Sequence, residues 1–183
     1  MRELLAMLPA PAEAARFGDD PNAVAEVLIH LVGRKLIDVP TPLEVHLNLQ
    51  WGTHACQLYR SREELLELVV PFFRQGLRHD EACAWIGREA LRFPEIDQVS
   101  WHDPDDWRAE KDVWLQRALD QGYRGLRVAG DTRGLGAIRG RRIKALCTYP
   151  VEHCDPSEVL SRHDAAYVKR DDGWARIAAS PTP

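Results

Sequence analysis

Short apolar runs alternate with amphipathic helical segments from residue 51 onward, and this alternation constrains the fold more than any other feature of the chain. A short apolar run between turn signals is typical of a buried strand. The runs are 54–59, 81–87, 125–130 and 143–149, with a further short one at 96–101. Strands that alternate with helices favour a parallel sheet with helices on both faces. We therefore predict an α/β fold with a mainly parallel sheet.

The expected helices carry recognisable start and stop residues. Ser61 and, three residues later, Glu64 form a capping-box sequence, and Gly76 is expected to end that helix. Asp103 followed by Pro104 predicts the start of a second helix. The remaining expected elements are a helix at 156–163 and a closing hairpin of strands 166–168 and 174–177.

The first quarter of the chain has a different pattern, in which prolines separate short segments. Helical signals over 12–17 and 21–32 are followed by strand signals at 36–39 and 43–49. This order of helix, turn, helix and two strands is that of a winged helix. Residues 1–48 carry 4 Lys and Arg against 7 Asp and Glu, a net charge of −3. Because DNA binding needs positive charge on the reading surface, contact with a protein is favoured over DNA binding.

The composition is that of an ordinary globular protein. Of the 183 residues, 45% are hydrophobic and 28% are charged, and the net charge is −4 at pH 7. No apolar run reaches the roughly 20 residues that a membrane-spanning helix needs, and the N-terminus lacks the apolar core of a signal peptide. Four cysteines are too few for a disulfide framework. These features predict a cytoplasmic protein with no membrane partner.

Four blocks of the sequence resemble one known family, in the family's order. They are WGTHACQLYRSREELLELVVPFFRQGLRHDEACAWI (51–86), GYRGLRVAGDT (122–132), IKALCTYPVEHCDPSEVLSRH (143–163) and VKRDDGW (168–174). Together they are similar to the MEDS domain, the sensory domain named for methanogens, methylotrophs and the DcmR regulator. The resemblance covers about 49–177. The stretches 88–111 and 131–143 are short for the family, which predicts that the sheet has lost helical cover on one side.

The resemblance implies a RecA-like core and a signal-sensing role, proposed for hydrocarbon derivatives, beside a kinase or a DNA-binding module. The positions that it carries over are His54, Tyr59, Gly76, Glu81, Arg127, Gly130, Cys147, Tyr149 and His163. The residues expected to bind the effector are His54, Tyr59, Glu81, Arg127, Tyr149 and His163. Because ligands of open α/β sheets bind at the carboxyl ends of the strands, we expect the effector at that edge.

A RecA-like ATPase carries a phosphate-binding loop after its first strand. Residues 59–62, which occupy that turn here, read Tyr-Arg-Ser-Arg. The chain contains no GxxxxGK[ST] sequence, so it lacks the glycine-rich loop and the lysine that hold the phosphates. We therefore expect no ATP as cofactor and no enzymatic activity.

Thiols and imidazoles recur in the expected sheet. Cys56 lies on the first strand, Cys147 near the end of another, and His153 and Cys154 in the loop that follows. Such side chains are able to meet around zinc or another soft metal ion. The alternatives are that Cys56, Cys83 and Cys147 pack in the core while Cys154 is accessible, or that the thiols sense redox state.

Arg127 lies within an expected buried strand, where an unpaired charge is costly. Glu81 opens a neighbouring strand and is its candidate partner. The two residues form either a structural ion pair or a clamp for a polar ligand.

These observations divide the chain into a winged-helix-like region at 1–48, a sensory domain at 49–178 and a disordered tail at 179–183. We predict a non-enzymatic regulatory protein that binds a small effector and relays the signal to a protein partner, such as a kinase or another regulator, with a homodimer left open. One alternative is a DNA-binding transcriptional regulator that reads DNA with residues 1–48. The other is a Cys/His metal sensor or a thiol-redox sensor.

Overall fold

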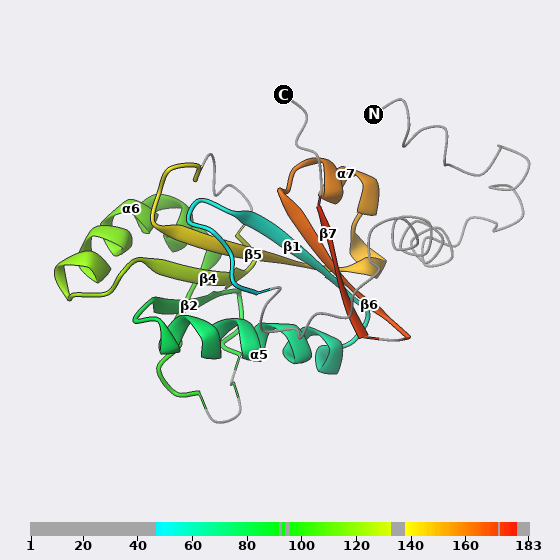
Figure 1. Cartoon of the computed structure of the whole chain (residues 1–183), viewed down its shortest axis with the longest axis horizontal. Coiled ribbons are helices and arrows are strands. Elements are labelled where there is room, and N and C mark those ends of the chain that lie inside the picture. The colour runs from blue at the N-terminus through cyan, green and yellow to red at the C-terminus, as the bar shows by residue number, and fades with distance from the viewer. Residues whose placement is uncertain (1–46, 92, 94–95, 133–137, 172, 179–183) are drawn as a thin grey trace, which may run out of the picture.

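A computed structural model of the chain describes residues 47–91, 93, 96–132, 138–171 and 173–178. In this part, seven strands form one sheet in the order β3-β2-β4-β5-β1-β6-β7 (Figure 1). Neighbouring strands are parallel except for β6 and β7, which pair antiparallel. The predicted α/β fold with a mainly parallel sheet is therefore confirmed. The predicted tail and all but the last two residues of the winged-helix-like region lie outside the described residues.

The elements alternate in the order that the sequence predicts. The strands are β1 (His54–Tyr59), β2 (Ala82–Ile86), β3 (Ser100–His102), β4 (Leu126–Gly130), β5 (Ile143–Pro150), β6 (Ala165–Arg170) and β7 (Gly173–Ala178). The helices are α5 (Arg62–Arg78), α6 (Pro104–Asp120) and α7 (Pro156–Ser161), with one 3-10 turn, η2 (Val151–His153). None of the helices described is long and apolar enough to cross a bilayer.

Helices cover both faces of the sheet, as expected. Helix α5 packs on one face, and α6 and α7 pack on the other, near opposite ends of the sheet (Figure 1). We call these the α5 face and the α6/α7 face. The α5 face also buries Leu47 and Leu49, which precede β1 and belong to no strand, although a strand was predicted over 43–49. On the α6/α7 face one apolar cluster gathers around Trp107 of α6 and a second around Val159 of α7.

The start of α5 follows from its capping residues, but its end does not. The Ser61 hydroxyl accepts a hydrogen bond from the backbone N–H of Glu64 at 3.2 Å, as the capping sequence predicts. Gly76 does not end the helix, which continues to Arg78. A Cβ at position 76 would lie 2.6 Å from Cδ of Arg127 and 2.7 Å from Sγ of Cys83. Glycine is thus required here for close packing of the helix on the sheet.

The edge of the sheet differs from the sequence prediction, whereas the β4–β5 connection agrees with it. The strand expected at 96–101 forms only at its end, as β3, where it pairs with β2. The described residues between β4 and β5 contain no helix, which agrees with the short connection noted in the sequence.

Candidate functional site

Three potential ligand side chains meet on the α6/α7 face. His54, Cys147 and His163 each bring one nitrogen or sulfur atom to within 4.8 Å of the other two. Nε2 of His54 lies 2.8 Å from Sγ of Cys147, and the centroids of the two imidazole rings are 4.3 Å apart. Among the residues that the structure describes, no other trio of His, Cys, Asp or Glu meets this criterion. We call these three residues the His–Cys cluster.

The sheet register brings the cluster together. Cys56 of β1 lies beside Cys147 of β5, so His54, two residues earlier on β1, projects from the same face as Cys147. Backbone bonds hold the start of β1 against Asp164, whose N–H donates to the His54 carbonyl at 2.7 Å and whose carboxylate accepts from the His54 N–H at 2.8 Å. His163 immediately precedes Asp164 and is thereby held over His54.

Thr132 reaches the cluster from the end of β4. Gly130 has φ of 116°, and a Cβ there would lie 2.0 Å from the carbonyl oxygen of Ile86, so only glycine fits. The chain then turns and places Oγ1 of Thr132 at 2.5 Å from Sγ of Cys147. Thr132 is 1% exposed, so this hydroxyl is directed into the protein. The sequence predicted no role for Thr132, because its neighbour Cys147 is known only once the strand order is known.

The His163 ring is bonded on one side only. Its Nδ1 lies 2.6 Å from the carbonyl oxygen of Val159, in α7. A carbonyl only accepts, so Nδ1 carries the proton and Nε2 carries a lone pair. Nε2 is buried and has no hydrogen-bond partner among the described residues. Burying an unpaired polar atom costs folding free energy. A bound group that donates to Nε2, or coordinates it, would remove this cost.

The environment of the cluster keeps its members uncharged. Burial, and then the nearby His163, lower the pKa of His54 from 6.5 to about 4. Burial also lowers the pKa of His163. Burial raises the pKa of Cys147 from 9.0 to about 12, although hydrogen bonds from Thr132 and Tyr149 oppose this rise. Near pH 7 the cluster therefore consists of two neutral imidazoles and a protonated thiol.

The predicted effector residues fall on the two faces of the sheet. His54 and His163 belong to the cluster, and the Tyr149 ring lies against His163 with centroids 5.5 Å apart. Tyr59 ends β1 and packs against the core of the α5 face. The cluster lies over the middle of β5, near the amino ends of β1 and β6, rather than at the carboxyl edge where the effector was expected.

Glu81 and Arg127 lie beneath α5, on the opposite face from the cluster, and form an ion pair. Nε of Arg127 is 2.5 Å from Oε2 of Glu81, and Nζ of Lys144 is 2.6 Å from Oε1. Arg127 also donates to the Phe72 carbonyl at 3.1 Å and stacks on the Phe72 ring. Arg127 is fully buried and Glu81 is 2% exposed, so the geometry favours the structural alternative over a ligand clamp. The sequence analysis did not predict that Lys144 joins this ion pair. The feature that could have indicated it is a single cation within an apolar run.

The predicted metal residues are only partly brought together. Cys147 is in the cluster, and Cys56 lies next to it in register but fully buried beside Ala166 and Val159. His153 is exposed at the end of η2, and Cys154 is half-buried after it. The imidazoles nearest to Cys147 are therefore His54 and His163, which the sequence assigned to the effector.

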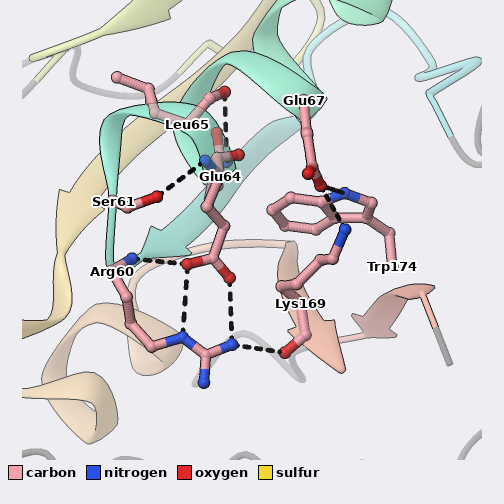
Figure 2. A network of polar contacts seen from close by, with 8 residues as sticks. Arg60, Ser61, Glu64, Leu65, Glu67, Lys169 and Trp174 are labelled. Carbon is pink, nitrogen blue, oxygen red and sulfur yellow. Dashed lines mark hydrogen bonds and ion pairs between the residues drawn. The ribbon is translucent and has the colours of Figure 1, made fainter. Parts of the chain in front are cut away.

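A carboxylate occupies the amino end of α5, directly after β1. Glu64, in the first turn of α5, accepts from the Arg60 backbone N–H at 2.8 Å and forms an ion pair with its guanidinium at 3.2 Å (Figure 2). Arg60 also donates to the Lys169 carbonyl, and Glu67 contacts both Lys169 and Trp174. These bonds fasten the amino end of α5 to the β6–β7 hairpin with the protein's own charges.

Comparison with known proteins supports the resemblance seen in the sequence. Residues 53–142 match the model of the MEDS family, described as the methanogen/methylotroph, DcmR sensory domain. The match covers just under half of the chain and includes β1 to β4 with both of their long helices. A search of curated proteins found no match. The predicted resemblance is thus confirmed over this range, and a sensory domain indicates a sensing or regulatory role with relay of a signal to a partner.

Proposed function

We propose that this chain is a non-enzymatic regulatory protein that binds a small effector at the His–Cys cluster and relays its presence to a partner. The match of residues 53–142 to a sensory domain supports the sensing role. The observation that carries the choice of site is the buried Nε2 of His163, which has no hydrogen-bond partner among the described residues. A bound molecule with one polar atom would supply that partner.

The surroundings of the cluster define the class of effector. Beside the polar atoms of His54, Cys147 and His163 lie apolar side chains, among them Cys56 and Val159. Such a site favours a small molecule with an apolar body and a single hydroxyl, amine, thiol or similar group. This description fits the hydrocarbon derivatives that the family resemblance implies. His54 and Tyr149 are half-buried, so each of these two side chains is partly exposed to solvent.

The same contacts provide a path for the signal. The hydrogen bond from His163 to Val159 couples the His163 ring to α7. The bonds between His54 and Asp164 couple the start of β1 to the start of β6. An effector that moves the His163 ring therefore changes how α7 sits on the sheet. The proposed receiver is a protein partner, a kinase or another regulator, acting in the cytoplasm. The acidic residues 1–48 disfavour DNA, and a second copy of the chain is a further candidate.

The test uses the tag-free full chain and thermal unfolding with short-chain alcohols, amines, thiols and halogenated hydrocarbons as probes. We expect at least one probe to raise Tm in a saturable way, because a ligand that binds only the folded state stabilises it. In His54→Ala the rise should vanish, with the stability of the free protein changed by no more than about 1–2 kcal/mol. The control is His153→Ala, which changes an exposed imidazole and should respond like the wild type. An equal rise in His54→Ala, or no rise with any probe in the wild type, would contradict the proposal.

A further inference from the structure

We propose that His54, Cys147 and His163 form a binding site for a zinc-type divalent metal ion, with the fourth coordination position open. The proposal deepens the proposed function and rests on it for one point only, that the effector occupies this open position. The ligand set itself rests on the geometry of the cluster.

The distances in the cluster suit a metal ion. Zinc bonds to imidazole nitrogen and thiolate sulfur at about 2.0–2.3 Å, which places tetrahedral ligand atoms about 3.3–3.6 Å apart. The three ligand atoms here lie within 4.8 Å of one another, and Nε2 of His54 lies 2.8 Å from Sγ of Cys147. Small rotations of the side chains bring all three to the coordination distance.

His163 is prepared as a ligand by its hydrogen bond. Metal-bound histidines commonly donate their second ring N–H to a carbonyl or a carboxylate, which fixes the tautomer and directs the other nitrogen at the metal. His163 has this arrangement, with Nδ1 at 2.6 Å from the Val159 carbonyl and Nε2 unpartnered. A metal ion would use the lone pair that the described residues leave unused.

Metal binding requires that the Cys147 thiol lose its proton. The bond from sulfur to the metal forms as the S–H bond breaks, and the proton leaves to solvent. Thr132 assists this step, because its hydroxyl lies 2.5 Å from Sγ and is able to donate to the thiolate. In the metal-free chain Sγ of Cys147 and Nε2 of His54 instead share a hydrogen bond at 2.8 Å.

Two imidazoles and one thiolate select the type of metal. This mixed set suits zinc among the common divalent ions, whereas magnesium and calcium prefer oxygen ligands. Structural zinc sites have four protein ligands, and catalytic or exchangeable sites have three with an open position. The three-ligand set here is of the second kind. An effector thiol, amine or alcohol would fill the open position as a fourth ligand.

The experiment is a cobalt titration of the tag-free full chain after treatment with a chelator. Co²⁺ replaces zinc and reports on its ligands by absorption, through a thiolate-to-metal charge-transfer band in the near ultraviolet and visible bands of tetrahedral geometry. We expect one equivalent to bind, with both signals, and zinc to displace it. Cys147→Ser should lose the charge-transfer band, and Thr132→Val should weaken binding about 10-fold or more, the usual effect of removing a bond to a ligand.

The matched control is Cys56→Ser, which changes the buried thiol next to Cys147 in register and should keep the band. Should a Cys147 variant fail to fold, X-ray absorption at the zinc edge of the wild type gives the same information. Two nitrogens and one sulfur are expected around the metal. Absence of cobalt binding, sulfur-free coordination, or a band that depends on Cys56 would overturn the site.

The outcomes separate the two proposals. A cobalt spectrum without any response to the effector probes contradicts the proposed function and leaves the metal site standing. A Tm rise that persists in chelator-treated protein with no cobalt spectrum contradicts the metal site and leaves the effector site standing.

Discussion

At the scale of single residues, the ion group beneath α5 has the largest predicted effect on stability. The single carboxylate of Glu81 pairs with two buried cations, Arg127 and Lys144. In Glu81→Gln both cations would remain buried without a carboxylate. Breaking a buried ion pair on one side costs about 3–5 kcal/mol. We expect the free energy of unfolding, measured with urea, to fall by about that amount.

The control for this prediction is Glu67→Gln, which removes an exposed carboxylate from its ion pair with Lys169. Exposed pairs contribute about 0–1 kcal/mol because water and salt screen them. If both variants lost the same small amount, Glu81 would not be the structural partner of the buried cations.

The four thiols should react at very different rates. Cys56, Cys83 and Cys147 are buried, and burial raises the pKa of each. Cys154 is only half-buried. Since the thiolate is the reactive form, a maleimide should label Cys154 first in the native, metal-free protein and the other three slowly. Mass spectrometry of timed peptide digests measures these rates, and rapid labelling of Cys147 would contradict the burial described here.

The sequence predicts Cys147 less well than the other thiols. It was expected near the end of a strand, either in a metal site or packed in the core, and the structure buries it within β5 at 1% exposed. The pairing of Arg127 with Glu81 was predictable, because a charge in a buried strand needs a partner. The meeting of His54 with His163 was not, because it depends on which strands are neighbours, and that order does not follow from local pattern.

At the scale of elements, Gly76 tests how α5 is fitted to the sheet. In the middle of an ordinary helix, replacing glycine by alanine stabilises by about 0.5–1 kcal/mol. Here the added Cβ would meet side-chain atoms of Arg127 and Cys83 at less than 3 Å. We expect Gly76→Ala to destabilise instead, by about 1–3 kcal/mol, the usual cost of overpacking. The urea midpoint of Gly76→Ala should therefore fall. A rise in the midpoint, as in an ordinary helix, would contradict the close packing.

Element starts were easier to predict than element ends. Ser61 and Asp103 cap their helices as expected, because a cap depends on residues only two or three positions away. The prediction that Gly76 ends α5 was wrong, because a glycine required for packing cannot be told by sequence from a glycine that ends a helix. The strand predicted at 96–101 was shortened to β3, since pairing with β2 rather than local pattern sets its length.

At the scale of the whole molecule, the α/β sheet carries no glycine-rich phosphate-binding loop after β1, and we expect that the chain does not hydrolyse ATP. The Glu64 carboxylate and its bonds to Arg60 occupy the amino end of α5 (Figure 2). The Glu64 carboxylate already accepts the Arg60 backbone N–H, which a phosphate at this helix N-terminus would need. We expect no phosphate release from ATP above the uncatalysed rate. Saturable turnover that is lost in Arg60→Ala or Arg62→Ala would show the opposite.

The central claim is that the His–Cys cluster binds the effector, and the imidazole resonances test it most directly. Long-range ¹H–¹⁵N correlation spectra of the ¹⁵N-labelled full chain resolve each ring nitrogen and its protonation. We predict that at least one of the hydrocarbon-derivative probes shifts the His54 and His163 ring signals saturably, while the exposed His79 and His153 do not move. If no probe shifts His54 and His163, or if the exposed rings shift equally, the cluster is not the effector site.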